Sequence, residues 1–330
     1  MRFSSPPSRR QTLALLAGAA LAPLTSTARA QAWPARPVTF VVPLPPGGAT
    51  DALTRKLADK LSKSLGQPVV VENRAGAGGT VGAGYVAKAN PDGHTILMGV
   101  TGSNAISASV YSKLPFNPAK DFAPVALIVR SPLVLVKRPG LAVNSLADYV
   151  AAARAKPEAI TYSSPGRGTT LHLAGGMLGI AANMRLMHVP YQGSGPALQA
   201  VLAEQVDSMF ADLMQVLPMI KAGKLHALAV TSKERHALLP QVPTVAESGF
   251  PQYEAISWHA LFAPAGTPGP VVEKLHAEVV QALREPDIQE HFAALGLVVD
   301  ARTPADTQRF VQEETQKWAQ VVKATGAALD

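Results

Sequence analysis

Short aliphatic runs alternate along the chain with longer segments in which apolar residues recur every three or four positions. The runs carry apolar side chains at successive positions, as strands do when both faces of their sheet are covered. A further short strand is predicted between Asp207 and Asp212. The aliphatic runs predict strands at residues 38–42, 69–71, 95–98, 133–136, 160–163 and 227–230.

Between these strands the spacing of apolar residues is helical. Leu53, Leu57, Leu61 and Leu65 lie four positions apart and give one apolar face, which Gly66 ends. Residues 116–124 and 239–253 are rich in proline and polar side chains and are predicted to be loops. Further helices are predicted at residues 80–88, 146–155, 169–180, 196–203, 216–222, 270–284 and 304–325.

Regular alternation of strand and helix predicts parallel βαβ units and therefore an α/β fold, with mostly parallel sheets and helices on both faces. Two lobes follow if the chain crosses a hinge twice, near residues 129–136 and again near 257–264. The first lobe would then comprise residues 31–129 plus 257–330, and the second lobe residues 130–256.

The first thirty residues have the pattern of a signal peptide. Arg2, Arg9 and Arg10 precede an apolar run at residues 13–24, and an A-x-A cleavage pattern ends at Ala30. The apolar run is too short to cross a hydrocarbon core of about 30 Å as a helix. We expect residues 1–30 to be removed after Ala30 and the protein to reach the periplasm. Residues 8–13 are similar to a twin-arginine signal, and the general secretory route is equally open.

Charge and cysteine content exclude several classes of function. Without the four arginines of the signal, the chain has 26 basic and 23 acidic residues, and its basic residues form no cluster. A nucleic-acid partner would need such a cluster, so none is expected. The absence of cysteine excludes disulfides, a thiolate nucleophile, thiolate metal sites and a lipid-anchored cysteine. No segment after the signal has transmembrane length, so no membrane insertion is expected.

Residues 43–51, PLPPGGATD, join the first strand directly to a helix. The first N–H groups of a helix lack intrahelical partners and carry partial positive charge, so such a turn can bind an anion without a cationic side chain. Gly47 and Gly48 allow an oxygen atom to approach the backbone, and Thr50 or Asp51 can cap the helix. An ordinary capped turn is the alternative.

Residues 163–170, SSPGRGTT, form a second turn of this kind in the other half of the chain. Gly166 and Gly168 bend it, and Ser164, Thr169 and Thr170 add hydroxyl donors. Two such turns, one in each predicted lobe, can face each other across a cleft, and this pairing favours an anion site.

Signatures of enzymes and cofactors are absent. The glycines of residues 74–82 lack the G-x-G-x-x-G spacing, so a close-packed turn that opens a helix is the better interpretation. Neither a G-x-S-x-G elbow nor an H-E-x-x-H zinc motif occurs, and the histidines are scattered. We therefore expect no catalysis, no cofactor and no metal. A secreted hydrolase or lyase that uses Asp212 and a histidine remains an alternative.

The ordered set of motifs resembles the substrate-binding receptors of tripartite tricarboxylate transporters, the Bug family, over nearly the whole mature chain. The matching segments are residues 43–51, 71–79, 90–93, 162–173, 188–193, 206–210, 220–225, 239–244 and 263–268. The resemblance implies a two-lobed periplasmic-binding-protein fold of the Venus-flytrap type. It also implies a small carboxylate as ligand: a di- or tricarboxylate, an aromatic acid or an acidic amino acid.

In this family backbone amides and hydroxyls from both lobes hold one carboxylate of the ligand. Carried over to this chain, the first lobe contributes Gly48, Ala49, Thr50 and Asp51, next to Gly47. The second lobe contributes Ser164, Gly168, Thr169 and Thr170, next to Gly166 and Arg167. Further wall residues would be Thr101, Ser103, Tyr191 and Asp212.

Three positions bear on the choice of ligand. Leu44 stands where the family often has an aromatic residue, and Thr169 stands where it often has serine. Arg167 either reaches a distal carboxylate of the ligand or is solvated. The resemblance further implies delivery of the ligand to membrane transporter subunits, and we expect a monomer. A sensor that acts on a signalling partner is the other alternative.

Overall fold

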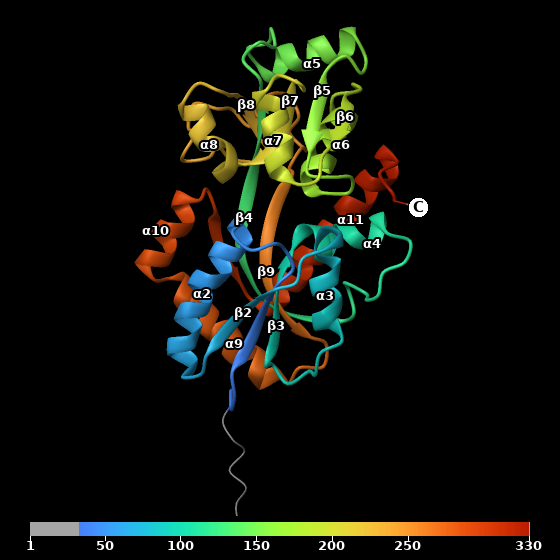
Figure 1. Ribbon diagram of the computed structural model, residues 1–330. Helices are drawn as coiled ribbons and strands as arrows, with labels where there is room; N and C mark the ends of the chain where they lie inside the picture. The colour runs from blue at the N-terminus through green and yellow to red at the C-terminus, as the bar shows by residue number, and fades with distance from the viewer. Residues whose placement is uncertain (1–32, 330) are drawn as a thin grey trace, which may run out of the picture. The chain divides into compact units, whose positions relative to one another are not determined.

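The computed structural model of the protein describes residues 33–329. The predicted signal peptide and its cleavage site after Ala30 lie outside these residues. Residues 36 onward belong to one unit, which contains two parallel ladders of strands joined by two long strands (Figure 1).

The first parallel ladder has β1 (Val38–Val42) between β2 (Val69–Asn73) and β3 (Thr95–Val100). Helix α2 (Ala49–Leu65) leads from β1 to β2, and α3 (Thr80–Ala87) leads from β2 to β3. These are the βαβ units that the alternation predicts. The predicted apolar face of α2 is confirmed, because Leu53, Leu57 and Leu61 are completely buried.

The second parallel ladder has β5 (Thr161–Ser164) between β6 (Met187–Pro190) and β7 (Ser208–Asp212). Helix α6 (Thr170–Ala181) connects β5 to β6, and α7 (Ser194–Leu202) connects β6 to β7. Helices α5 (Leu146–Ala155) and α8 (Leu213–Lys221) flank this ladder in the chain, before β5 and after β7.

Strand β4 (Phe122–Lys137) belongs to both halves of the unit. It pairs in antiparallel fashion with β9 (Ile256–Pro264) and β10 (Val298–Arg302), and then with β7 and β8 (His226–Val230). The last rung with β9 joins Pro132 to Ile256, and the first rung with β7 joins Leu133 to Asp212. The backbone of β4 therefore passes from one half to the other between Pro132 and Leu133.

The predicted fold class is confirmed, with one refinement. The sheets are mixed rather than mostly parallel, because β9 runs opposite to β3 and β7 runs opposite to β4. The change of partner in β4 lies within the first predicted crossing, residues 129–136, and β9 begins one residue before the second, residues 257–264. The lobe boundaries, 31–129 plus 257–330 and 130–256, remain our assignment.

Several elements depart from the sequence expectations. Helices α9 (Gly269–Leu283) and α11 (Pro304–Thr325) lie where predicted, but α10 (Pro286–Ala294) and β10 were missed. The turn after β3 is also helical, with a π-helix at Gly102–Ile106 followed by α4 (Ser107–Val110). The loop prediction for residues 116–124 is wrong at its end, because β4 already begins at Phe122. Pro124 is tolerated there because the ladder with β9 shifts its register next to it.

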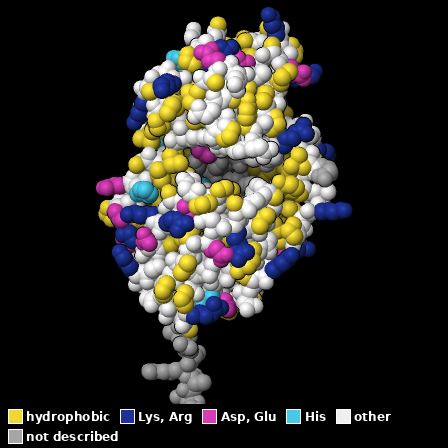
Figure 2. All heavy atoms as spheres, viewed as in Figure 1, with side chains coloured by type: hydrophobic (Ala, Val, Ile, Leu, Met, Phe, Trp, Pro, Cys, Tyr) yellow, Lys and Arg dark blue, Asp and Glu magenta, His cyan; other side chains and the backbone are white. Residues whose placement is uncertain are grey.

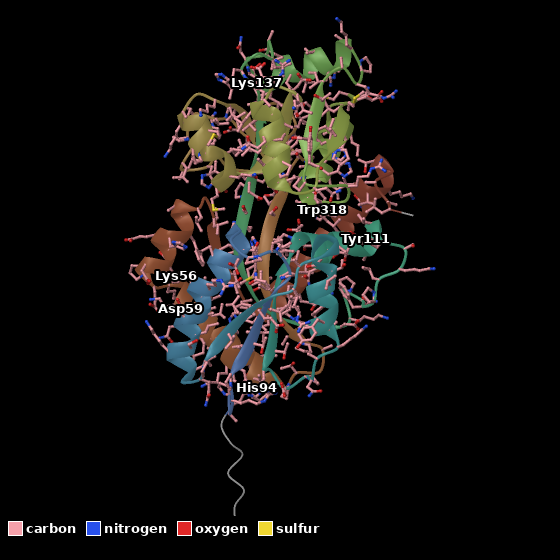
Figure 3. The ribbon with its side chains drawn as sticks, viewed as in Figure 1. Lys56, Asp59, His94, Tyr111, Lys137 and Trp318 are labelled. Atoms are coloured by element: carbon pink, nitrogen blue, oxygen red, sulfur yellow. The ribbon has the colours of Figure 1, made fainter. Side chains whose placement is uncertain are left out.

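Helix α11 packs against both halves of the unit. Thr325 near its end lies against Gly176 of α6, since a Cβ atom added to that glycine would be 2.6 Å from Thr325 Cγ2. Nearer the middle of α11, the buried Glu314 accepts hydrogen bonds from the indole N–H groups of Trp258 and Trp318, at 3.2 and 2.9 Å. Trp318 is labelled in Figure 3. One carboxylate thus links α11 to β9. None of the helices within residues 33–329 is long and apolar enough to cross a membrane.

We predict that Glu314→Ala lowers the free energy of unfolding by about 2–4 kcal/mol, because it leaves two buried indole donors without an acceptor. Chemical denaturation followed by circular dichroism measures this loss. Glu313→Ala, a substitution at the neighbouring exposed position of the same helix, is the control and should change stability little. Equal effects of the two substitutions would contradict the structural role of Glu314.

Candidate functional site

Most of the residues predicted to bind a ligand lie in loops that begin at the carboxyl ends of parallel strands. In open α/β sheets such ends are where ligands bind. Residues 47–51 follow β1, and Thr101 and Ser103 follow β3. In the second ladder, residues 164–170 begin at the end of β5, Tyr191 follows β6, and Asp212 ends β7.

The carboxyl ends of the two ladders face each other along β4. His259 on β9 lies opposite both Val100, the last residue of β3, and Val129 of β4. Asp212 lies opposite Leu133 of β4. Leu133 lies four positions after Val129 on this extended strand, which corresponds to about 13 Å. Figure 2 shows a hollow between the two halves of the unit, with an acidic side chain inside it.

The two halves also touch beside this hollow. A Cβ atom added to Gly168 would lie 2.7 Å from Cγ1 of Val110, so the second turn packs on α4. A Cβ atom added to Gly296, which precedes β10, would lie 2.9 Å from Cδ2 of Leu213 at the start of α8. The halves therefore approach each other closely at two glycine positions.

The first turn leaves backbone donors available at the start of α2. Gly48 is the N-cap, with extended backbone at φ −84° and ψ 174°, and no side chain caps the helix. The first N–H groups of a helix have no intrahelical acceptor, so those of Ala49 and Thr50, which no capping side chain accepts, are left as donors. Gly47 bends the turn with φ +84°, a conformation that favours glycine.

Asp51 supports this turn from inside. Its carboxylate accepts hydrogen bonds from Gly47 N–H at 3.0 Å and from Asn73 Nδ2 at 2.9 Å, and it forms an ion pair with Arg55 at 3.0 Å. Burial alone would raise the pKa of this carboxyl, but the donors Arg55, Gly47 and Asn73 outweigh burial and hold the pKa below its usual value. Asp51 is therefore an ionised brace of the turn.

Thr50 is also used inside the fold. Its hydroxyl lies 2.8 Å from Nε2 of His259, and both side chains are buried. Burial lowers the pKa of His259 to about 4, so the imidazole is neutral at pH 7. The pair joins the first turn of α2 to strand β9.

The second turn is held by its own side chains. Thr169 caps α6: its Oγ1 accepts from His172 N–H at 3.3 Å and donates to Gly166 O at 2.8 Å. Gly168 N–H donates to Nδ1 of His172 at 3.1 Å. The buried hydroxyl of Ser164 is hydrogen-bonded to Nε2 of His188 at 2.6 Å. These hydroxyls shape the turn, in addition to any contact with a ligand.

The other predicted residues of the second half surround this turn. Arg167 is exposed and Thr170, the first residue of α6, is buried. Tyr191 is partly buried, and its N–H donates to Ser164 O at 2.9 Å.

Thr101 and Ser103 are buried at the end of β3. Thr101 Oγ1 accepts from Trp258 N–H at 2.8 Å. The hydroxyl of Ser103 donates to Asn104 Oδ1 at 2.6 Å. Both residues lie in the first half at the ladder's carboxyl end, but their hydroxyls are bonded within the fold.

Asp212 differs from Asp51, the other acidic residue predicted for the site. Its side chain is partly exposed and forms no hydrogen bond or ion pair with any residue that the structure describes. Loss of hydration at this position raises the pKa of its carboxyl to about 6.

Comparison with known proteins identifies the family to which this chain belongs. The sequence matches the tripartite tricarboxylate transporter family receptor, TctC, over residues 53–327. The chain belongs to the TctC family.

Two curated relatives support the assignment of this chain to the TctC family. It is 43% identical over 312 residues to the UPF0065 protein in the tcbD–tcbE intergenic region of Pseudomonas sp. (strain P51), which covers 93% of each chain. It is 38% identical to the protein BugT of Bordetella pertussis, over 94% of this chain and 95% of BugT. The resemblance predicted from the sequence motifs is confirmed.

Solved structures are similar to this chain in both sequence and fold. R. palustris Rpa4515 with adipate is 37% identical, with a TM-score of 0.81, over 89% of this chain and 98% of Rpa4515. MatC (Rpa3494) from Rhodopseudomonas palustris with bound malate is 36% identical, with a TM-score of 0.78, over 88% of this chain and 100% of MatC. The periplasmic binding protein BugD is 36% identical, also with a TM-score of 0.78, over 90% of this chain and 99% of BugD.

The sequence analysis did not identify the residues that support the two turns of this TctC-family receptor through hydrogen bonds. Arg55 is signalled by its i,i+4 spacing from Asp51, which suits an ion pair on a helix. Asn73 and His259 carry no such signal, because they come from strands distant in sequence. His172 and His188 were interpreted as isolated, yet their rings stack with centroids 3.9 Å apart.

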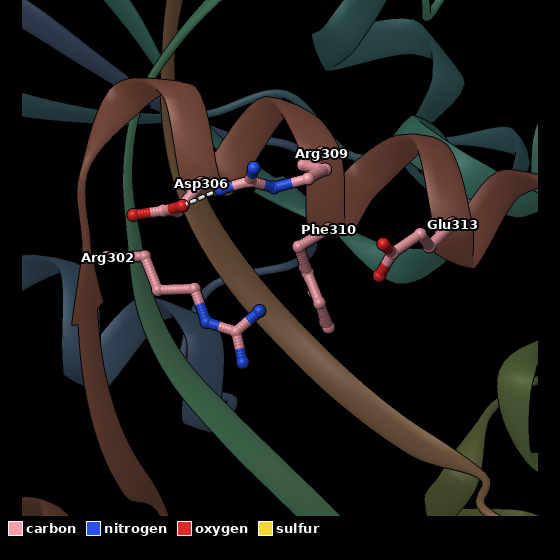
Figure 4. Close-up of a pocket in the computed structure, with 5 residues that line it drawn as sticks. All are labelled: Arg302, Asp306, Arg309, Phe310 and Glu313. Atoms are coloured by element: carbon pink, nitrogen blue, oxygen red, sulfur yellow. Dashed lines mark hydrogen bonds and ion pairs between the residues drawn. The ribbon is translucent and has the colours of Figure 1, made fainter.

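The described cavities lie away from these turns. One, of about 240 Å³, is lined by the last residue of β10 and by residues of the first part of α11: Arg302, Asp306, Arg309, Phe310 and Glu313 (Figure 4). The other, of about 470 Å³, is apolar and lies among α6, α11 and residues 249–253. Within residues 33–329 no three His, Asp or Glu side chains are grouped so that they could hold a metal ion.

We predict that the stacked histidines make stability depend on pH. Burial lowers the pKa of His172 to about 4 and that of His188 to about 3, and nearby charge adds to the effect. Because the unfolded chain protonates near the ordinary value of about 6.5, it binds more protons than the folded protein below that pH. Stability should therefore fall as the pH drops from about 6.5 toward these folded values.

Melting temperatures between pH 7.5 and 4.5 measure this dependence. The variant His172→Asn/His188→Gln should lose less stability on acidification than the wild type, although it starts lower. The control His226→Gln changes an exposed histidine and should keep the wild-type slope. Identical slopes for all three proteins would refute a contribution from the stacked pair.

Proposed function

We propose that this protein is a periplasmic receptor that binds a small carboxylate between the two turns and delivers it to membrane transporter subunits. The observation that carries the proposal is the uncapped start of α2, whose N–H groups lie at the carboxyl end of one ladder, with a second helix start at the end of the other. Membership of the TctC family supports the receptor role.

Backbone donors account for anion binding without a dedicated cation. Each contact between an anionic group and a helix N-terminus contributes roughly 0.3–1 kcal/mol when exposed and up to about 2 kcal/mol when partly buried. Micromolar binding corresponds to about −8 kcal/mol. Hydrogen bonds from the amides of residues 48–50 and 169–170, together with the remaining wall residues, must supply much of the difference.

The ligands named for two solved relatives support a carboxylate. Rpa4515 is described with adipate and MatC with bound malate, both dicarboxylates. We carry over the chemical class and not either compound. In this proposal the ligand leaves the protein unchanged, the receptor acts as a monomer, and export removes residues 1–30.

We predict that Gly48→Val weakens carboxylate binding at least tenfold and leaves the melting temperature of the free protein nearly unchanged. The backbone at Gly48 suits any residue, and the nearest atom to an added Cβ is Pro45 O at 4.0 Å. The branched side chain would therefore fit, but it would cover the amides of α2.

A thermal-shift panel of organic acids would first identify a ligand, since binding to the folded form raises apparent stability. Calorimetry would then compare the variants. Gly269→Val, at another uncrowded glycine at a helix start, is the matched control and should bind like the wild type. Unchanged affinity in Gly48→Val would remove this turn from the site.

A separate prediction concerns Arg167, which is exposed in the second turn. If its guanidinium reaches a distal carboxylate, Arg167→Ala should weaken a dicarboxylate about tenfold and a monocarboxylate of similar length much less. Arg185→Ala, which removes an exposed arginine elsewhere in the same half, controls for net charge. Equal losses for both ligand classes would discard the role of Arg167.

A further inference from the structure

Asp212 places a carboxylate without a protein partner beside the proposed anion site. It is the last residue of β7, and its rung with Leu133 is the first rung of β4 in the second half. The next residue, Leu213, packs against Gly296 of the first half. The side chain is partly exposed, and none of the described residues donates a hydrogen bond to it or pairs with its charge.

An ordinary structural role does not explain this carboxylate. Asp212 is the N-cap residue of α8, but its side chain caps no N–H group of that helix. By contrast, Asp51 at the other turn is engaged by Gly47, Asn73 and Arg55. Partial loss of hydration raises the pKa of this carboxyl, so a donor on a bound molecule would stabilise its charged form.

A plain dicarboxylate cannot supply such a donor. At neutral pH its groups are acceptors only, and a second negative charge across the hollow would repel Asp212. A hydroxyl or an ammonium group on the ligand would instead donate to Asp212 while a ligand carboxylate binds the amides of α2. The α2 start is tied through Thr50 to His259, which lies opposite Val129 of β4, and Asp212 lies opposite Leu133, four positions farther along the same strand.

We propose that Asp212 is a specificity-determining residue that selects carboxylates carrying a hydroxyl or ammonium donor and disfavours the plain diacids of the same length. This inference rests on the proposed function, and it names the ligand class of that same site. At pH 7.5 Asp212 is ionised, since its pKa is raised only to about 6.

The experiment compares matched ligands by calorimetry at pH 7.5. The panel consists of succinate, glutarate and adipate, each with its 2-hydroxy and 2-amino derivative. The wild type should bind a substituted acid at least tenfold more tightly than the plain diacid of equal length. Asp212→Asn should reduce that preference and, because it removes the repulsion, tighten binding of the plain diacid severalfold.

Two further variants separate the specific effect from general ones. Asp212→Ser removes the charge with a smaller side chain and provides a second test should the amide disturb folding. Glu234→Gln removes an exposed charge from the same half and should leave every affinity unchanged. A tighter plain diacid in either Asp212 variant cannot arise from a merely structural defect, which would weaken all ligands alike.

Several results would overturn the inference. They are equal binding of plain and substituted acids by the wild type, unchanged affinities in both Asp212 variants, or a uniform loss for all ligands. If the wild type binds no member of this panel and none of a wider set of organic acids, the proposed function itself fails. Binding of plain diacids that Gly48→Val abolishes but Asp212→Asn leaves unaltered would keep the function and reject only the role of Asp212.

Discussion

The continuous backbone of β4 is the constraint on which the rest of the structure depends. Because one strand pairs with β9 up to Pro132 and with β7 from Leu133, it fixes how far apart the carboxyl ends of the two ladders can lie. A loop in its place would allow a wide range of separations. The strand instead joins the two ladders without an intervening loop.

This constraint explains why the side chains of the turns are used mainly within the fold. Thr50, Ser164 and Thr169 bond to His259, His188 and the start of α6. Asp51 bonds to its own turn. Such bonds hold the backbone so that its free N–H groups point in fixed directions before a ligand arrives, which lowers the ordering cost of binding. Binding by main-chain donors then demands rigid turns more than reactive side chains.

Much of the fold can be predicted from the sequence because its signals are local. Leucines four apart give α2, Gly66 ends it, and the aliphatic runs give β1, β2, β3, β5, β8 and the last part of β4. The positions of both turns follow equally, since each lies between a strand and a helix. Strand β9 was recognised only as a crossing, and α10 with β10 went unnoticed. The irregular rung at Pro124 also concealed the start of β4, because proline in a strand normally argues against one.

The support of the site could not be predicted in this way, because it depends on contacts between distant segments. Thr50 and His259 are 209 residues apart, and Asn73 meets Asp51 from the next strand. His172 and His188 were interpreted as scattered, and nothing in their spacing reveals that their rings stack. Sequence patterns specify which residues lie at a strand end, whereas the partner behind each residue is set by the packing of the whole unit.

In both turns a neutral imidazole is hydrogen-bonded to a residue at or next to the start of a helix. His259 bonds to Thr50 in the first turn, and His172 accepts the N–H of Gly168 in the second. Burial lowers the pKa of both histidines to about 4, which keeps them uncharged. If these imidazoles were protonated, their buried positive charge would attract any anion regardless of its shape. A proton on Nδ1 of His172 would also prevent that atom from accepting the N–H of Gly168. Neutral support therefore leaves anion binding to the directional amides, and a fixed charge such as Asp212 can then act on selectivity without competing with a buried positive centre.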